Sequence, residues 1–227
     1  MRILTYNLRS LRDDPLAVAR VVRACAPDLL CLQEVPRYGR WRAARAGLAR
    51  EVGMTVLAGR RTAGLAVLGR PGVRLLASGF HRLPWAPPLH RRALAVAVVS
   101  VEGRALAVAS THLGLDPRER LRHADLVLRL LAGRPAPAVL AGDFNEGPDG
   151  PAWRLLASRL RDAHAVAPEG GAATFPAGGP RRRIDGIFTD PRLTVLGCGV
   201  PPDPGGDFAR ATDHLPVLAR LAPGGEG

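Results

Sequence analysis

Apolar and polar positions follow two periods along the chain, one typical of strands and the other of helices. Short apolar runs bounded by polar or turn-forming residues predict strands at residues 3–6, 28–32, 54–58, 65–68, 73–77, 93–101, 105–110, 138–141, 184–188, 193–196 and 215–218. Apolar residues three or four positions apart predict helices over residues 15–26, 41–52, 117–131 and 153–160. The chain therefore opens with strand, helix and strand, and its middle part is typical of antiparallel hairpins.

Two of these helices begin with an Asp-Pro pair, in which the aspartate caps the helix and the proline fits its first turn. These pairs are Asp14-Pro15 and Asp116-Pro117. The helical spacing predicts that the first helix buries Leu16, Ala19, Val22 and Ala26, and that the third buries Leu121, Ala124, Leu128 and Leu131.

Helices interleaved with many strands predict an α/β fold in which two mixed sheets stack face to face and helices cover them. The length of 227 residues and the hydrophobic content of 47% suit one domain, which we place at residues 1–221. Residues 168–180, rich in Gly, Ala and Pro, are predicted to form a long loop. Residues 222–227 are predicted to be a frayed tail.

The formal charge of +12 is carried by arginine alone, since the chain has 32 basic residues and no lysine. Guanidinium groups match phosphate oxygens, so this charge is consistent with a nucleic-acid partner. A coding sequence rich in G and C would give the same abundance of Arg, Ala, Gly and Pro without such a partner. The charge alone slightly favours this second interpretation.

Three cysteines in apolar contexts, Cys25, Cys31 and Cys198, predict buried reduced thiols and a reducing compartment. The chain starts without an apolar stretch suited to a signal peptide, and no run approaches about 18 apolar residues. We therefore expect a cytoplasmic monomer without a membrane segment.

Polar side chains that can bind a metal or move a proton stand at the ends of the apolar runs. Asn7, Glu34, His112, Asp143 and Asn145 follow predicted strands, and Asp185, Asp213 and His214 stand where late strands begin. The end of one strand and the start of its antiparallel neighbour share an edge, so all eight can converge on one rim. Taken singly, each fits a turn, a cap or a surface position. Taken together in this order, they indicate a site.

Six short segments carry these residues: Thr5-Tyr6-Asn7-Leu8, Leu32-Gln33-Glu34-Val35, Ser110-Thr111-His112-Leu113, Gly142-Asp143-Phe144-Asn145, Arg183-Ile184-Asp185 and Thr212-Asp213-His214-Leu215-Pro216. In this order they resemble the motifs of the endonuclease/exonuclease/phosphatase superfamily. That superfamily includes deoxyribonuclease I, apurinic endonucleases, sphingomyelinases and inositol polyphosphate 5-phosphatases. The resemblance runs from residue 3 to about residue 219, and it implies a four-layer sandwich that hydrolyses a phosphate ester.

The resemblance implies that Glu34 is the main Mg²⁺ ligand, with Asn7 nearby and Asp213 as an additional ligand; Mn²⁺ is the alternative ion. It also implies substrate contacts from arginines. Arg92 falls where related proteins carry an arginine before a strand, although its neighbour Arg91 could take the same register. Three arginines, Arg181, Arg182 and Arg183, lead into Asp185, and we expect Arg183 to reach substrate phosphate.

The catalytic roles are likewise implied by the resemblance. Asp143 is expected to orient or deprotonate the attacking water, and Asn145 and His112 to hydrogen-bond phosphate oxygens. His214, oriented by Asp185, is expected to carry charge beside the scissile phosphate. For the remaining histidines we expect solvent or packing positions: His81, His90, His123 and His164.

The substrate remains open at this point. After Glu34 the chain has Val35 and Pro36 where apurinic endonucleases typically have a lysine, and it lacks their tryptophan-rich ending. It also lacks the secretion signal of a digestive deoxyribonuclease and a membrane-binding insertion like that of sphingomyelinases. We expect a nuclease or other phosphodiesterase acting on nucleic acid, with a phosphatase or phosphodiesterase for a small or lipid-derived phosphate ester as the alternative. A third class, an inactive nucleic-acid-binding module, would need neither Asp143 nor Glu34.

Overall fold

The computed structural model describes residues 1–134 and 136–222, in which twelve strands form two six-stranded sheets. The first sheet has the order β11-β12-β1-β2-β4-β3. Its strands are β1 (Arg2–Asn7), β2 (Leu29–Gln33), β3 (Thr55–Ala58), β4 (Ala66–Gly69), β11 (Val195–Gly199) and β12 (Val217–Leu221). Strands β1 and β2 run parallel and the other pairs run antiparallel, so the sheet is mixed.

The second sheet has the order β5-β6-β7-β8-β10-β9 and is also mixed, with β7 and β8 parallel. Its strands are β5 (Arg74–Arg82), β6 (Ala93–Val101), β7 (Arg104–His112), β8 (Ala138–Asp143), β9 (Arg161–Asp162) and β10 (Asp185–Thr189). The predicted strands are all present, within a few residues of their expected bounds. The two-residue strand β9 was not predicted, because it is too short to show a period of two.

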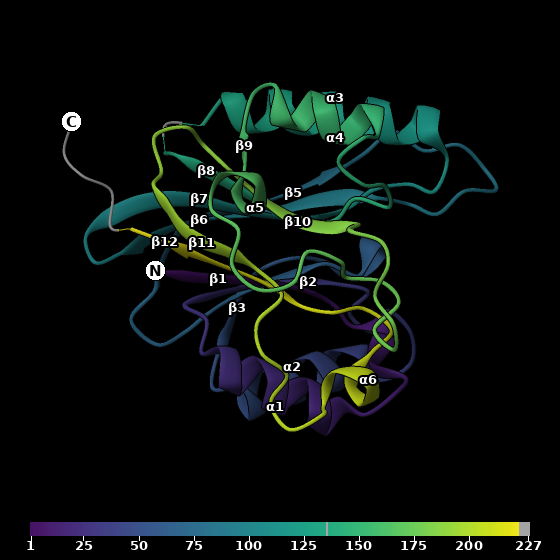
Figure 1. The fold of residues 1–227 in the computed structure, drawn as a ribbon, viewed down its shortest axis with the longest axis vertical. Helices are drawn as coiled ribbons and strands as arrows, with labels where there is room; N and C mark the ends of the chain where they lie inside the picture. Colours follow the sequence, from purple (N-terminus) through teal and green to yellow (C-terminus); the bar gives the residue numbers. More distant parts are fainter. Residues whose placement is uncertain (135, 223–227) are drawn as a thin grey trace.

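Helices cover the outer face of each sheet (Figure 1). On one side lie α3 (Pro117–Ala132) and α4 (Pro151–Ala157), and on the other α1 (Pro15–Cys25), α2 (Trp41–Glu51) and α6 (Phe208–Ala211). Shorter elements are α5 (Ala163–Val166) and two 3₁₀ turns, η1 (Arg9–Leu11) and η2 (Arg61–Ala63). The predicted four-layer sandwich of two stacked mixed sheets is confirmed. Among the described residues, no helix is long and apolar enough to cross a membrane.

The layer between the sheets is packed with aliphatic side chains and two of the buried thiols, Cys31 and Cys198. Successive side chains of a strand point to opposite faces of the sheet, so only every second residue enters this layer. In β1, Ile3 points into the layer, while Leu4 packs with α1 on the other face. The larger rings gather instead beneath α3 and α4, where Phe144, Trp153 and Phe188 are buried in mutual contact. The few aromatic residues are thus concentrated outside the inter-sheet layer.

The predicted caps are present, but two predicted helix faces are rotated. Asp14 accepts hydrogen bonds from the first turn of α1, and Asp116 does the same for α3. Leu16 and Leu121, expected in the core, are exposed. The buried face of α1 contains Ala17, Val18, Ala19, Val21, Val22 and Cys25, and that of α3 contains Glu119, Arg120, His123, Ala124, Val127 and Leu131. The prediction for α3 was correct for Ala124 and Leu131 and wrong for Leu121, because it counted only apolar residues, whereas polar side chains are also buried there.

The predicted loop at residues 168–180 has no helix or regular strand, but isolated bridges attach it to the body. Pro168 and Gly171 pair with β11 and the residue after it, and Phe175 pairs with Arg182. Of the predicted tail, Ala222 donates a backbone hydrogen bond to Thr194, and residues 223–227 lie outside the described residues.

Candidate active site

Strand alternation brings polar side chains to one end of the inter-sheet layer. The residues that face this layer begin as apolar ones and end as polar ones: Ile3, Thr5 and Asn7 in β1; Val108, Ser110 and His112 in β7; Val139, Ala141 and Asp143 in β8; Ile187 and Asp185 in β10. His112 and Asp185 are direct neighbours of Asp143 in the two adjacent strands. The end of the layer is therefore a buried polar site.

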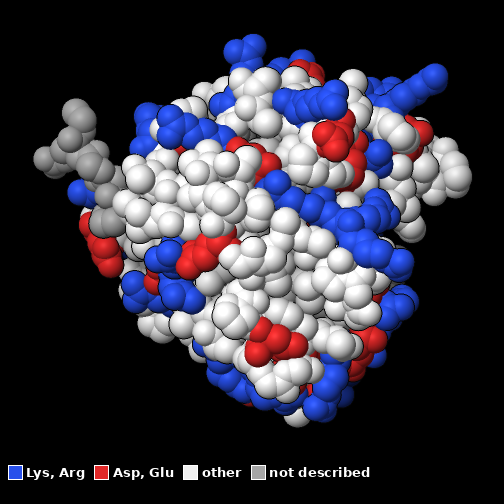
Figure 2. Space-filling model, in the orientation of Figure 1, with Lys and Arg blue, Asp and Glu red and all other residues white. Residues whose placement is uncertain are grey.

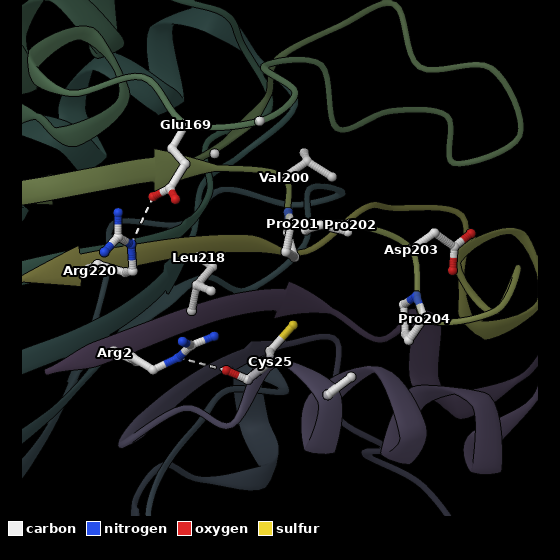
Figure 3. A pocket seen from close by; sticks show the side chains of 13 residues that line it. Arg2, Cys25, Glu169, Val200, Pro201, Pro202, Asp203, Pro204, Leu218 and Arg220 are labelled. Atoms are coloured by element: carbon white, nitrogen blue, oxygen red, sulfur yellow. Dashed lines mark hydrogen bonds and ion pairs between the residues drawn. The ribbon is translucent and has the colours of Figure 1, made fainter.

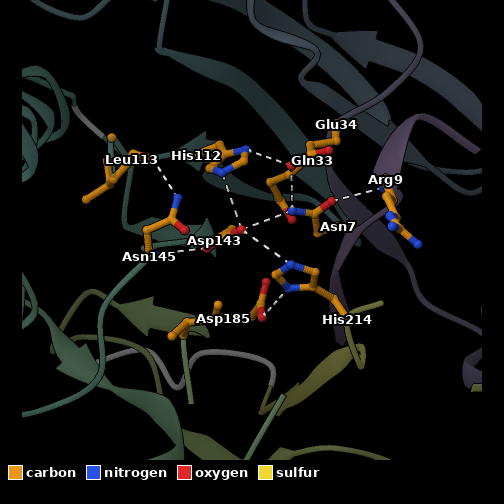
Figure 4. Close-up of polar contacts among 12 residues, drawn as sticks. Asn7, Arg9, Gln33, Glu34, His112, Leu113, Asp143, Asn145, Asp185 and His214 are labelled. Atoms are coloured by element: carbon orange, nitrogen blue, oxygen red, sulfur yellow. Dashed lines mark hydrogen bonds and ion pairs between the residues drawn. The ribbon is translucent and has the colours of Figure 1, made fainter. Parts of the chain in front are cut away.

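Asp143 occupies the centre of this site (Figure 4). Its Oδ2 accepts a hydrogen bond of 2.9 Å from Asn7 Nδ2, which crosses from the other sheet. The same oxygen lies 3.3 Å from His112 Nε2 and 3.8 Å from His214 Nε2. Its other oxygen accepts from the backbone N–H of Asn145 at 2.9 Å. One carboxylate is thus surrounded by two imidazoles and two asparagines.

The two imidazoles differ in charge because their surroundings differ. Burial and the positive Arg92 hold the pKa of His112 well below its usual value of 6.5. Burial also opposes the charge of His214, but Asp185 and Asp143 outweigh it and raise the pKa of His214 to about 9. Burial and the charge of Asp185 raise the pKa of Asp143 to about 7. At neutral pH, His214 is the cation of the site and His112 is neutral.

His214 and Asp185 form the predicted dyad, in which His214 Nδ1 donates to Asp185 Oδ2 at 2.9 Å. Thr174, which sequence reasoning missed, connects their two segments. Its hydroxyl accepts from the backbone N–H of Asp185 at 3.2 Å, and its carbonyl accepts from Leu215 N at 2.7 Å. Phe175 lies against the imidazole, with ring centroids 4.9 Å apart. The orientation of the dyad is therefore set by the loop at residues 168–180.

Glu34 lies beside the centre and is its most open carboxylate, with a side chain 40% exposed. Its Oε1 lies 3.4 Å from Asn7 Nδ2 and 4.0 Å from His112 Nδ1. Asn7 presents its nitrogen to both Glu34 and Asp143, while its oxygen accepts from Arg9 N at 3.0 Å. Asn7 thus connects the two carboxylates.

The carboxylate oxygens of the site fit a hard divalent cation, which prefers oxygen ligands. Beside Glu34, the carboxylates of Asp143 and Asp185 have oxygens within 4.8 Å of each other, whereas the protonated His214 has no lone pair to offer a metal. Asp185 Oδ1 is buried and has no hydrogen-bond partner within the described residues. Asp213, expected as an additional ligand, lies at the edge, where it contacts Arg9 Nε at 3.4 Å.

The structure separates the candidate arginines. Burial lowers the pKa of Arg92, while Asp143 and Glu34 act in the opposite direction, so Arg92 lies within electrostatic reach of the site. Arg91 instead stacks over the ring of Trp85.

The prediction for Arg183 is wrong. Its side chain, only 14% exposed, pairs with Asp162 and lies over the ring of Trp153. Asp162 pairs with Phe188, which is three residues further along β10 than Asp185. The Arg183 guanidinium is therefore directed away from the site and packs against Trp153.

Two buried charged residues that the sequence did not reveal hold the loops after β7 and β8 together. Arg120 donates to Glu146 at 2.8 Å and to the carbonyl of Leu115 at 2.7 Å. Glu146 also accepts from the backbone N–H of Trp153 at 2.8 Å. These loops begin directly after His112 and Asp143, so the Arg120–Glu146 pair fixes the ends of both strands.

A separate hollow of about 520 Å³ lies between β11, β12 and the end of α1 (Figure 3). Its basic groups already have partners: Arg220 donates to Glu169, and Arg2 donates to the carbonyl of Cys25. The polar residues that surround Asp143 are not among its lining residues. The chemistry therefore lies at the strand ends and not in this hollow.

Comparison with known proteins agrees with this geometry. Residues 4–214 match the model of the Endonuclease/Exonuclease/phosphatase family. Human protein angel homolog 1 is 31% identical over 158 residues, a match covering 57% of this chain but only 23% of that relative. An endonuclease/exonuclease/phosphatase from Beutenbergia cavernae superposes with a TM-score of 0.77 and 26% identity, covering 99% of this chain and 72% of that one. A mannosyl-6-phosphatase from Bacteroides thetaiotaomicron superposes with a TM-score of 0.83 and 19% identity, and the match covers 98% of this chain and 99% of that one. The chain belongs to the endonuclease/exonuclease/phosphatase family, whose members hydrolyse phosphate esters.

Proposed function

We propose that this protein is a magnesium-dependent phosphodiesterase that acts on nucleic acid. The observation that carries the proposal is the set of contacts around Asp143. A buried carboxylate lies between a neutral and a charged imidazole, and an open carboxylate stands beside it. Such a set can activate water on one side of a phosphate and neutralise charge on the other.

Each side chain has a defined task in this proposal. Asp143 orients the attacking water and accepts its proton, since its Oδ2 is the meeting point of the polar contacts. Asn145 donates one amide hydrogen to the carbonyl of Leu113, which fixes its plane and leaves the other for a phosphate oxygen. His112 donates to a second phosphate oxygen. His214, held by Asp185, places a positive charge beside the scissile bond.

Glu34, with Asn7 beside it, would hold Mg²⁺, which when bound polarises the phosphoryl oxygen and neutralises developing negative charge. A panel of DNA, RNA, bis(p-nitrophenyl) phosphate and phosphomonoesters, assayed with magnesium, tests the proposal. We expect diesters to be hydrolysed and Asp143→Ala to abolish this activity. Turnover of monoesters alone would contradict it.

We predict that Glu34→Gln raises the magnesium concentration needed for half-maximal activity by at least ~10-fold. The amide keeps the shape of the side chain but removes its negative charge, the feature that a hard cation prefers. The measurement is a magnesium titration of hydrolysis rate, with Glu102→Gln, a change at an exposed hairpin turn, as the control. Full wild-type activity in excess chelator would exclude a metal requirement.

A basic surface supports the choice of nucleic acid. Figure 2 shows a band of basic side chains over the start of β10 and the loops beside it. Arg181 and Arg182, which are exposed, lie in the segment leading to β10. Arg182 stacks over Phe175, the ring that contacts His214. These two arginines can reach phosphates that flank the scissile one.

We predict that replacing both Arg181 and Arg182 with Ser weakens binding of a DNA or RNA strand and flattens its salt dependence. Each lost phosphate contact lowers the slope of log K against log salt concentration by about 0.7 to 0.9. Turnover at saturation should change less, because such contacts are equal in the ground and transition states. The measurement is KM at several salt concentrations.

The matched control for this prediction is the double replacement of Arg74 and Arg104, exposed residues at the opposite end of the second sheet. It removes the same charge without touching the site. If the slope is unchanged by Arg181→Ser and Arg182→Ser on every nucleic acid tested, the substrate is instead a compact phosphate ester.

A further inference from the structure

The aromatic residues fall into two groups that differ in their surroundings. Five are buried: Tyr6, Phe144, Trp153, Phe188 and Phe208. Each of the other five has an arginine guanidinium over its ring, in the pairs Tyr38–Arg37, Trp41–Arg42, Phe80–Arg60, Trp85–Arg91 and Phe175–Arg182. Their guanidinium-to-centroid distances run from 3.9 Å for Trp85 to 6.0 Å for Phe175. Every aromatic ring that reaches the surface is thus paired with a cation.

Three of these pairs belong to segments that border the active site. Phe175 contacts His214 directly. Tyr38 follows Glu34 by four residues and is 79% exposed. Trp85 lies in the loop between β5 and β6, and it lines a small hollow together with Arg92. The Phe175 pair therefore contacts the site, and the other two pairs lie in segments connected to Glu34 and Arg92.

A larger open hollow of about 720 Å³ lies beside Tyr38, between the start of α1 and α2. Its walls are η1, the start of α1, the segment that begins at Pro36, and one face of α2. Tyr38 and Trp41 line it, and Arg40 and Arg50 stand at its border. The hollow thus combines the exposed ring of Tyr38 and the half-buried ring of Trp41 with two arginines and one carboxylate, Glu51.

We propose that these aromatic–arginine pairs bind the unpaired bases of a single-stranded nucleic acid by stacking, with Tyr38 as the main contact. The inference rests on the proposed function, because it concerns the strand whose phosphate enters that site. A base face can stack on an aromatic ring while the adjacent guanidinium contacts its phosphate or its π system. In a duplex these faces are covered by neighbouring base pairs, so the rings would select single strands.

The experiment measures equilibrium binding of short fluorescent strands to the full chain carrying Asp143→Asn, so that hydrolysis does not interfere. Three probes are compared at one ionic strength: oligothymidylate, an abasic strand of equal length and charge, and a blunt DNA duplex. An oligouridylate arm separates RNA from DNA. We expect the oligothymidylate to bind more tightly than the abasic strand and the duplex.

On that background, Tyr38→Ala is expected to weaken oligothymidylate binding by about 5- to 150-fold, as for other base-stacking rings, and abasic binding less than about 2-fold. Tyr38→Trp should restore the affinity, since it returns an aromatic face. Leu196→Ala, at an exposed residue of β11, is the control and should change neither.

Equal affinity for base-containing and abasic strands, or equal losses for both in Tyr38→Ala, would overturn the stacking inference while leaving the proposed nuclease function intact. Hydrolysis of a small diester without binding of any strand would overturn both. Preference for the duplex would overturn the inference, because it would place base pairs rather than single bases at the rings.

Discussion

Replacing Asp143 with Asn is expected to lower turnover at least ~100-fold, within the range typical of removing a general base. The amide keeps the size of the side chain but cannot accept a proton from water. Its NH₂ group would also face Asn7 Nδ2 and His112 Nε2, which both approach the same carboxylate oxygen. The measurement is kcat on a chromogenic diester, with metal loading confirmed.

The fold should survive this change. Because burial and Asp185 raise the pKa of Asp143 to about 7 from 3.8, the native state binds more protons than the unfolded state between these values. Deprotonation of Asp143 therefore lowers the free energy of unfolding as the pH rises through this window. A neutral amide does not titrate, so it avoids this decrease. One buried donor, Asn7 Nδ2 or Asn145 N, loses its acceptor in the variant, which opposes this gain. Without added metal, the melting temperature at pH 8 should therefore stay close to that of the wild type.

Asp149→Asn makes the same chemical change at a fully exposed carboxylate and should leave turnover unchanged. Near-normal turnover of Asp143→Asn would remove this carboxylate from the mechanism. A large fall in melting temperature would instead indicate that the lost activity reflects unfolding.

The fold could be predicted because its strands are short and apolar and because two of its helices, α1 and α3, start at recognisable caps. The positions of the polar residues at strand ends then follow from alternation, since Asn7, Asp143 and His112 continue faces that begin with Ile3, Val139 and Val108. The sequence alone does not reveal which strands of the two sheets face one another. That arrangement brings Asn7 to Asp143, two residues 136 positions apart.

What could not be predicted depends on contacts between distant segments. Thr174 stands in a loop whose composition suggests only irregular structure, yet its hydroxyl and carbonyl hold the dyad. Arg120 is buried because Glu146 pairs with it, and a pattern of apolar positions does not reveal such a pair. Arg183 looks like Arg181 and Arg182 in the sequence, but its side chain turns inward because it pairs with Asp162.

Replacing His214 with Ala is expected to lower turnover at least ~100-fold, because the positive charge beside the scissile phosphate is lost. Asp185→Asn should also cause a large loss, since its amide favours the wrong tautomer and no longer supports the charged imidazole. Turnover of the diester is the measurement, and His164→Ala, a histidine of α5, is the control that should keep wild-type turnover.

The double variant decides whether the two residues act as one unit. If Asp185 serves only to orient and charge His214, then Asp185→Asn should cost almost nothing once His214 is already Ala, so the losses are far from multiplicative. Multiplicative losses would assign Asp185 a separate task. Its buried Oδ1, which has no hydrogen-bond partner within the described residues, is the atom free for such a task, and metal binding is the one to measure first. A weaker magnesium affinity in Asp185→Asn but not in His214→Ala would identify Asp185 as a metal ligand.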